Sequence, residues 1–163
     1  MFDDCNTVAE VLDIYWDEIK KGDYLITTLQ AGAEKAINRI KDGGKKMRKV
    51  VIAFDVDGTL IQNGATSEWD MKPNRRIVRL LEALASFKNV RIVVWSGAGK
   101  EWADSAVKML DIGEYVKATY SKNLVGRDDN GHPLFEPDIT PDIAIDDIQA
   151  CDLGVLNLIV KEK

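Results

Sequence analysis

The chain has 163 residues, of which 45% are hydrophobic and 30% are charged. This length and composition predict one folded domain that buries a sizeable core without disulfides or a structural metal, and they argue against wholesale disorder. The 22 basic and 27 acidic residues give a net charge of −5, which disfavours a protein that coats nucleic acid.

Residues 1–47 are predicted to form an N-terminal extension of two amphipathic helices. Thr7 and Glu10 have the spacing of a capping box, and apolar residues then recur at helical intervals. A second helix is expected over residues 24–41, ahead of a pair of glycines that ends it. We expect these helices to serve as packing elements, and they offer a surface through which copies of the chain could form a homo-oligomer.

Residues 48–163 are predicted to form an α/β core in which strands and helices alternate. The expected strands cover residues 50–54, 90–95, 115–120, 143–145 and 155–160, and the expected helices cover residues 75–87 and 100–110. Apolar strands separated by helices indicate a Rossmann-like parallel sheet with helices on both faces. Asp129-Asn130-Gly131 is a hairpin-type turn signal, so a small β-hairpin flap is expected over residues 124–135.

Polar residues follow directly on four of the expected strands. They are Asp55, Asp57 and Thr59 after the first strand, Ser96 and Gly97 after the second, Lys122 after the third, and Asp146 and Asp147 after the fourth. Ligands of open parallel sheets bind at the carboxyl ends of the strands, so these groups are expected to form one site. A site with so many carboxylates needs a divalent cation, and oxygen ligands suit Mg²⁺.

This set of residue types fits phosphoryl transfer. A strand-end carboxylate such as Asp55 can attack phosphorus, while Asp57 can protonate the leaving oxygen and later deprotonate the attacking water. Ser96 and Lys122 supply a hydroxyl and a positive charge for the phosphate oxygens. Gly58 allows a turn tight enough for backbone N–H groups to approach a phosphate.

Four segments resemble, in the same order, the four motifs of the haloacid dehalogenase superfamily. They are residues 51–59, residues 93–97, Lys122 and residues 143–147. The resemblance implies that Asp55 is the nucleophile and that Asp57 is the general acid/base. It also implies phosphate contacts from Thr59, Ser96, Gly97 and Lys122, and a Mg²⁺ site that draws on Asp55, Asp57, Asp146 and Asp147.

The resemblance further implies a hydrolase, namely a Mg²⁺-dependent phosphomonoester phosphatase that works through an aspartyl-phosphate. The first motif has aspartate at its second acidic position, Asp57, and in this it resembles the phosphatase branch of the superfamily. The intervals after the first and third strands hold no cap domain, so the chain resembles the capless members. Sugar phosphates and other small phosphate esters, nucleotides and phosphorylated nucleic-acid ends all remain open as substrates.

Two other function classes and one residue assignment also stay open. A phosphoacceptor receiver domain uses similar groups, but there the acidic pair ends the first strand and the acceptor aspartate ends the third. A catalytically silent interaction module on the same fold is the other alternative. Lys117 and Lys108 compete with Lys122 as the phosphate-binding lysine, and His132 is expected on the surface of the hairpin.

The sequence shows no sign of secretion or membrane insertion. Asp3 and Asp4 stand where a signal peptide has basic residues, and no apolar run approaches the ~20 residues that cross a bilayer. Cys5 and Cys151 belong to no Cys/His cluster, so no zinc site is expected. We therefore expect a cytoplasmic protein with reduced cysteines and no membrane partner.

Overall fold

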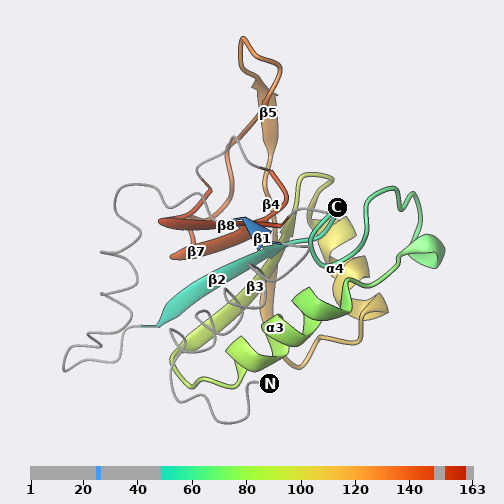
Figure 1. Ribbon diagram of the computed structural model, residues 1–163, viewed down its shortest axis with the longest axis vertical. Helices are drawn as coiled ribbons and strands as arrows, with labels where there is room; N and C mark the ends of the chain where they lie inside the picture. The colour runs from blue at the N-terminus through green and yellow to red at the C-terminus, as the bar shows by residue number, and fades with distance from the viewer. Residues whose placement is uncertain (1–24, 27–48, 149–152, 161–163) are drawn as a thin grey trace.

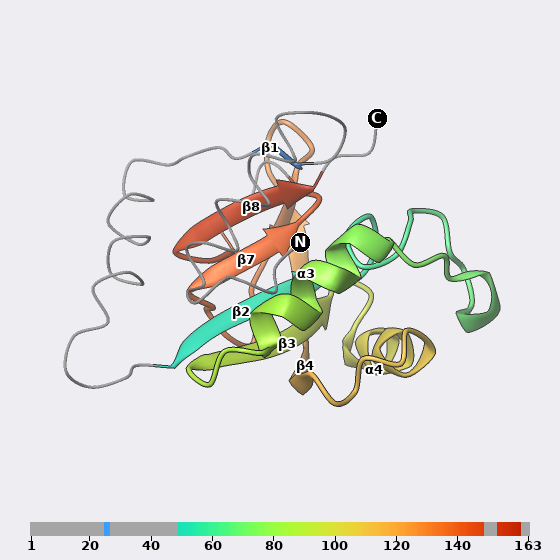
Figure 2. The ribbon, with the colours of Figure 1, turned by 60° about the horizontal axis from the view of Figure 1, so that its bottom comes forward.

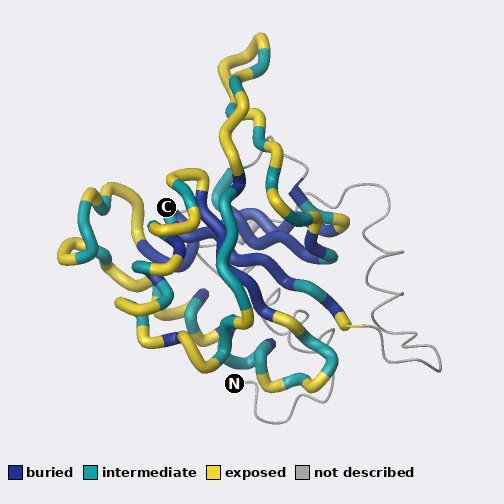
Figure 3. Tube along the Cα trace, turned by 180° about the vertical axis from the view of Figure 1, so that it is seen from behind, coloured by how far each residue is buried: buried dark blue, intermediate teal, exposed yellow. Residues whose placement is uncertain are grey.

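A six-stranded sheet in the order β1-β8-β7-β2-β3-β4 forms the centre of the computed structural model, which describes residues 25–26, 49–148 and 153–160 (Figure 1). Its strands are β1 (Leu25–Ile26), β2 (Val50–Asp55), β3 (Val90–Ser96), β4 (Val116–Ser121), β7 (Ile143–Asp146) and β8 (Leu156–Val160). The five strands from β8 to β4 run parallel, which confirms the expected parallel α/β sheet. Of these, β2, β3, β7 and β8 are mostly buried, whereas β4 at the edge is only partly buried (Figure 3).

Two helices pack on one face of this sheet. They are α3 (Arg75–Ala85) and α4 (Lys100–Met109), with a short 3₁₀ helix, η1 (Glu68–Asp70), ahead of α3. The buried side chains of α3 recur at helical spacing and join Ile52 and Phe54 of β2 in the main hydrophobic cluster. Among the described residues, no helix is long and apolar enough to span a membrane.

The expectation of helices on both faces is wrong for the part of the chain that the structure describes. There, α3 and α4 lie on the same side of the sheet (Figure 2), and the opposite face is a smaller cluster built around Trp95 and Leu153. The connections from β2 to β3 and from β3 to β4 cross in the same direction, so right-handed crossovers put both helices on one face. The connection from β4 back to β7 carries a hairpin instead of a helix.

The predicted hairpin is confirmed. β5 (Leu124–Arg127) and β6 (Pro133–Phe135) pair antiparallel and project from the body of the protein (Figure 1). Asp128 Oδ1 accepts the backbone N–H groups of Asn130 and His132 across the turn. His132 is exposed there, as expected for a surface position.

The predicted helix over residues 24–41 is wrong at its first residues. Leu25 and Ile26 form β1, which pairs antiparallel with β8 in the register Leu25↔Val160 and Ile26↔Ile159. A short apolar pair suits a strand as well as a helix, and the open edge of β8 offers it backbone partners. The remainder of this helix, the helix that starts at the Thr7–Glu10 capping box, and any oligomer contact through them lie outside the described residues.

Candidate active site

The chain makes a tight loop where β2 ends. The carbonyl of Val56 accepts the backbone N–H groups of Thr59 and Ile61, at 3.3 and 3.0 Å. Gly58 has a φ of 75°, a left-handed conformation that glycine adopts without strain. The glycine predicted to permit a tight turn therefore does so.

Three carboxylates meet beside this loop. Asp55 comes from the end of β2, whereas Asp146 and Asp147 come from the end of β7, its neighbour in the sheet. One oxygen of each carboxylate lies within 4.8 Å of the others. Asp55 and Asp146 are buried and Asp147 is half-buried. We refer to Asp55, Asp146 and Asp147 as the carboxylate cluster.

A buried lysine completes the carboxylate cluster. Lys122 Nζ lies 2.7 Å from Asp55 Oδ1 and 2.9 Å from Asp146 Oδ2, and its side chain is 2% exposed. Its backbone N–H donates to the carbonyl of Ser96, so the end of β3 sets its position. Of the two rivals, Lys117 is exposed at the second residue of β4 and Lys108 is exposed on α4. The geometry therefore favours Lys122 as the lysine of the site.

The charges in the site act on one another strongly. Burial and then the charge of Asp146 raise the pKa of Asp55 well above its usual range, and Lys122 only partly opposes them. Burial, followed by Asp146, also raises the pKa of Asp147, to about 6. For Lys122, burial alone would lower the pKa, but Asp55 and Asp146 outweigh it and raise the pKa above its usual range. Three carboxylates and one ammonium leave two negative charges when all are ionised.

The other predicted phosphate contacts lie at the ends of neighbouring strands. Thr59 is in the loop after β2, and Ser96 and Gly97 are at the end of β3. The buried Ser96 Oγ accepts the backbone N–H of Ala98 at 3.0 Å and so holds the turn after β3. Gly97 is exposed at that turn. The Thr59 hydroxyl is buried and has no hydrogen-bond partner among the residues described. A buried hydroxyl with spare bonding capacity is a candidate contact for a bound group.

Asp57 lies outside the carboxylate cluster. Its carboxylate is half-buried, and its Oδ2 accepts a hydrogen bond of 2.9 Å from the indole Nε1 of Trp102 on α4. Burial raises the pKa of Asp57, while this hydrogen bond and Lys122 oppose the rise. The resemblance placed Asp57 in the Mg²⁺ site, whereas the structure turns its side chain towards a neutral donor.

Two aromatic residues near the site were not found from the sequence. Trp102 contacts Asp57 as described, and the ring centre of Phe135 on β6 lies 5.0 Å from Lys122 Nζ. Phe135 also approaches Gly97, where an added Cβ would be 3.2 Å from the ring. Neither residue belongs to a motif. A tryptophan on an amphipathic helix and a phenylalanine in a hairpin are both typical of packing residues. No sequence pattern therefore indicates that they lie near the site.

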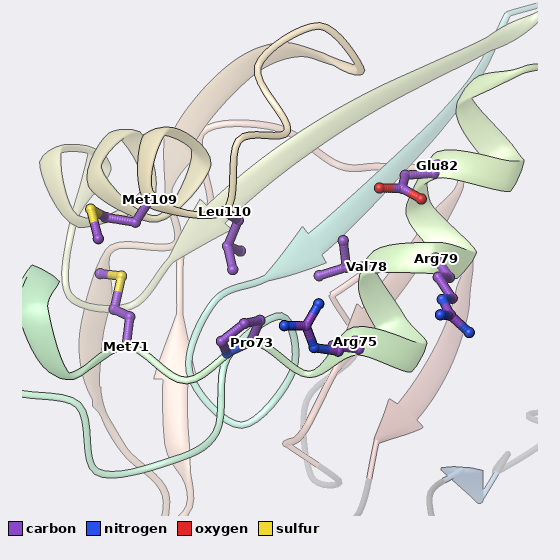
Figure 4. A pocket seen from close by; sticks show the side chains of 8 residues that line it. All are labelled: Met71, Pro73, Arg75, Val78, Arg79, Glu82, Met109 and Leu110. Atoms are coloured by element: carbon purple, nitrogen blue, oxygen red, sulfur yellow. The ribbon is translucent and has the colours of Figure 1, made fainter.

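A cavity of about 260 Å³ lies elsewhere, between α3 and the end of α4 (Figure 4). Its lining residues are Met71, Pro73, Arg75, Val78, Arg79, Glu82, Met109 and Leu110. None of these residues belongs to the carboxylate cluster. The cavity therefore adds nothing to the chemistry at the strand ends.

Comparisons with known proteins do not assign the chain to a family. No family model, no curated protein and no solved structure matches it. Its function therefore rests on the chemistry of the residues at the strand ends.

Proposed function

We propose that the protein is a Mg²⁺-dependent phosphomonoester phosphatase of the haloacid dehalogenase type, in which Asp55 takes up the phosphoryl group. One observation carries the proposal. Asp55 ends a buried parallel strand with one carboxylate oxygen paired to Lys122, and it sits within 4.8 Å of two further carboxylates. Buried groups with strongly shifted pKa values, gathered at the carboxyl ends of strands, are typical of catalytic sites.

The carboxylate cluster fits a divalent cation. Asp55, Asp146 and Asp147 offer hard oxygen donors at close range, and with Lys122 they carry two net negative charges. These three aspartates would hold Mg²⁺. When bound, the ion would neutralise the carboxylate cluster and polarise a phosphoryl oxygen.

The residues of the chain divide the reaction into two steps. In the first, a carboxylate oxygen of Asp55 bonds to phosphorus while the bond from phosphorus to the leaving oxygen breaks, and Asp57 gives that oxygen its proton. In the second, water attacks phosphorus, Asp57 takes a proton from the water, and the bond from phosphorus to Asp55 breaks. Lys122 places a positive charge beside Asp55, where negative charge builds up on the phosphoryl oxygens.

One observation also supports the silent interaction module. Lys122 already occupies an oxygen of Asp55 and an oxygen of Asp146, as it would in a purely structural ion cluster. A receiver domain fits less well, because the acidic pair ends β7 and not the first strand of the core.

A phosphatase screen separates these functions. The full chain is incubated with Mg²⁺ and with sugar phosphates, nucleotides and oligonucleotides phosphorylated at the 3′ or 5′ end. We expect phosphate release from at least one class, and its loss in EDTA. No release from any class by protein whose fold is verified would favour the silent module.

The stability of the metal-free protein should depend on the protonation of Asp147. Its pKa is raised to about 6, so between about pH 4 and pH 6 the folded chain binds more protons than the unfolded chain. In EDTA, thermal stability should therefore rise as the pH falls from 7 to 5. The variant Asp147→Asn keeps the charged groups that face this position, namely Asp55, Asp146 and Lys122. Its thermal stability should therefore change less with pH than that of the wild type. Identical profiles for the variant and the wild type would contradict this.

Gly58 should matter for metal binding as well as for folding. A Cβ added there would lie 2.4 Å from Asp147 Oδ2, so Gly58→Ala should push that carboxylate out of the carboxylate cluster. Gly64 is the matched control, since it also has positive φ but no atom within 4 Å of an added Cβ. Both variants should lose roughly 1–2 kcal/mol through backbone strain. Gly58→Ala should lose more than Gly64→Ala, because its Cβ would also lie 2.8 Å from Asn63 Nδ2. Only Gly58→Ala should weaken stabilisation by Mg²⁺: the Mg²⁺ concentration needed for half of the stabilising effect should rise about ten-fold or more.

Thermal unfolding across a Mg²⁺ titration measures both effects of the two glycine variants. Equal Mg²⁺ responses in Gly58→Ala and Gly64→Ala would show that Asp147 does not hold the ion.

A further inference from the structure

The hydrogen bond between Trp102 and Asp57 links α4 to the loop after β2. The indole Nε1 lies 2.9 Å from Asp57 Oδ2, and both side chains are half-buried. This loop carries Asp57 and directly follows Asp55, the last residue of β2, while α4 follows the turn that begins after Ser96, the last residue of β3. The bond therefore joins two of the four strand-end segments that build the site.

Trp102 is held firmly enough to act as a fixed donor. Its ring packs against the main hydrophobic cluster, and its neighbour Ala103 on α4 is fully buried. A hydrogen bond from Ser105 to Glu68 also joins α4 to η1. Core packing of the ring and a helix tied to η1 together fix the direction from which Asp57 receives its hydrogen bond.

The chemistry of the indole group determines what this hydrogen bond does. An indole N–H donates but cannot accept, so it cannot take a proton from Asp57. A protonated carboxyl has one O–H, and the oxygen that accepts the indole N–H is disfavoured as the site of that proton. With Oδ2 engaged, Oδ1 is the oxygen that carries the proton in the acid form.

We infer that Trp102 is a positioning residue that selects Oδ1 of Asp57 as the oxygen that exchanges protons with the substrate. The inference rests on the proposed phosphatase function. In the first step the Oδ1–H bond breaks, the leaving oxygen gains the proton, and the electron pair of its bond to phosphorus stays on that oxygen. In the second step Oδ1 takes a proton from the attacking water.

A purely structural role makes a different prediction. If the indole N–H merely satisfies its own hydrogen bond, its loss should affect all substrates alike. If it positions the acid, its loss should matter most where the leaving group needs a proton. An alkyl phosphate has such a leaving group, whereas para-nitrophenyl phosphate leaves without one.

The test compares the two substrates in Trp102→Phe, which keeps an aromatic ring and removes the N–H. We expect kcat/KM for the alkyl phosphate, which reports the first step alone, to fall roughly ten-fold or more, part of the ~10²–10⁴-fold that general acid catalysis contributes. kcat/KM for para-nitrophenyl phosphate should fall less than about three-fold, because its leaving group needs no proton. The second step, in which Oδ1 takes a proton from water, is common to both substrates and enters kcat only. Trp69→Phe is the control, because Trp69 is 91% exposed on η1.

The same comparison of substrates can be made in a variant that lacks the acid. In Asp57→Asn, the further change Trp102→Phe should leave the ratio of the two rates unaltered, because the acid to be positioned is gone. Trp102→Met, which keeps apolar volume in the helix and also lacks the N–H, replaces Trp102→Phe if the latter fails to fold.

The outcomes separate the inference from the proposed function. Equal losses of kcat/KM for both substrates, or no loss for either, in a protein whose wild type hydrolyses both would overturn the role of Trp102 alone. A wild type that hydrolyses neither these esters nor any class in the phosphatase screen would overturn the proposed function and the inference with it.

Discussion

Replacing Asp55 by asparagine should lower phosphate release by at least about 10³-fold while leaving the protein folded. An amide of the same shape cannot attack phosphorus, so the covalent route is lost. Folding should be kept because Lys122 retains Asp146 as a partner and because a neutral side chain is easier to bury than a carboxylate. Initial rates with Mg²⁺ and thermal unfolding of the same samples measure the two expectations.

The matched control for this experiment is Asp104→Asn. Asp104 is an exposed aspartate of α4 that pairs with Lys100, and its loss should leave the rate within about two-fold. Acid-quenched wild-type enzyme should also carry one added phosphoryl group by mass spectrometry, and Asp55→Asn should not. A folded Asp55→Asn variant that keeps most of the rate would mean that Asp55 is not the acceptor.

Replacing Lys122 by methionine should cost about 3–5 kcal/mol of stability, whatever the function of the site. The change leaves the buried carboxylates of Asp55 and Asp146 without their counter-charge, and breaking a buried ion pair from one side is strongly destabilising. Lys100→Met is the control, since Lys100 lies 2.7 Å from Asp104, as Lys122 does from Asp55, but in an exposed pair. The control should lose less than about 1 kcal/mol.

Urea unfolding in EDTA at neutral pH measures the difference between the two lysine variants. The raised pKa of Lys122 means that its contribution is complete below about pH 10 and declines as the pH rises further towards the folded pKa. The difference in the free energy of unfolding between wild type and Lys122→Met should therefore become smaller in strong alkali. Equal losses in the two lysine variants would mean that burial does not strengthen the pair.

The sheet and much of the site could be predicted because both depend on local patterns. Apolar runs such as residues 50–54 identify buried strands, and the polar residues directly after them must emerge at one edge of a parallel sheet. Asp55, Asp146 and Asp147 accordingly meet in the structure. The amphipathic spacing of α3 identified it with an error of two residues at its end.

The features that could not be predicted depend on contacts between distant segments. Leu25 and Ile26 fit a helical pattern, and only the open edge of β8 makes them a strand. Nothing local to Trp102 shows that it meets Asp57, because that contact depends on how α4 lies against the loop after β2. The buried pairing of Lys122 with two carboxylates likewise needs the packed fold, not the motif.

The pairing of β1 with β8 bears on where this chain can be shortened. β8 is buried along its whole length, and an unpaired edge of such a strand would present a row of bare backbone donors and acceptors to other molecules. All the segments with proposed chemistry lie after residue 48, yet β1, which pairs with the edge of β8, comes from before it. The residues of the proposed active site and the strand that pairs with the edge of β8 therefore come from opposite sides of residue 48. A fragment cut there would keep the first and leave the edge of β8 without β1.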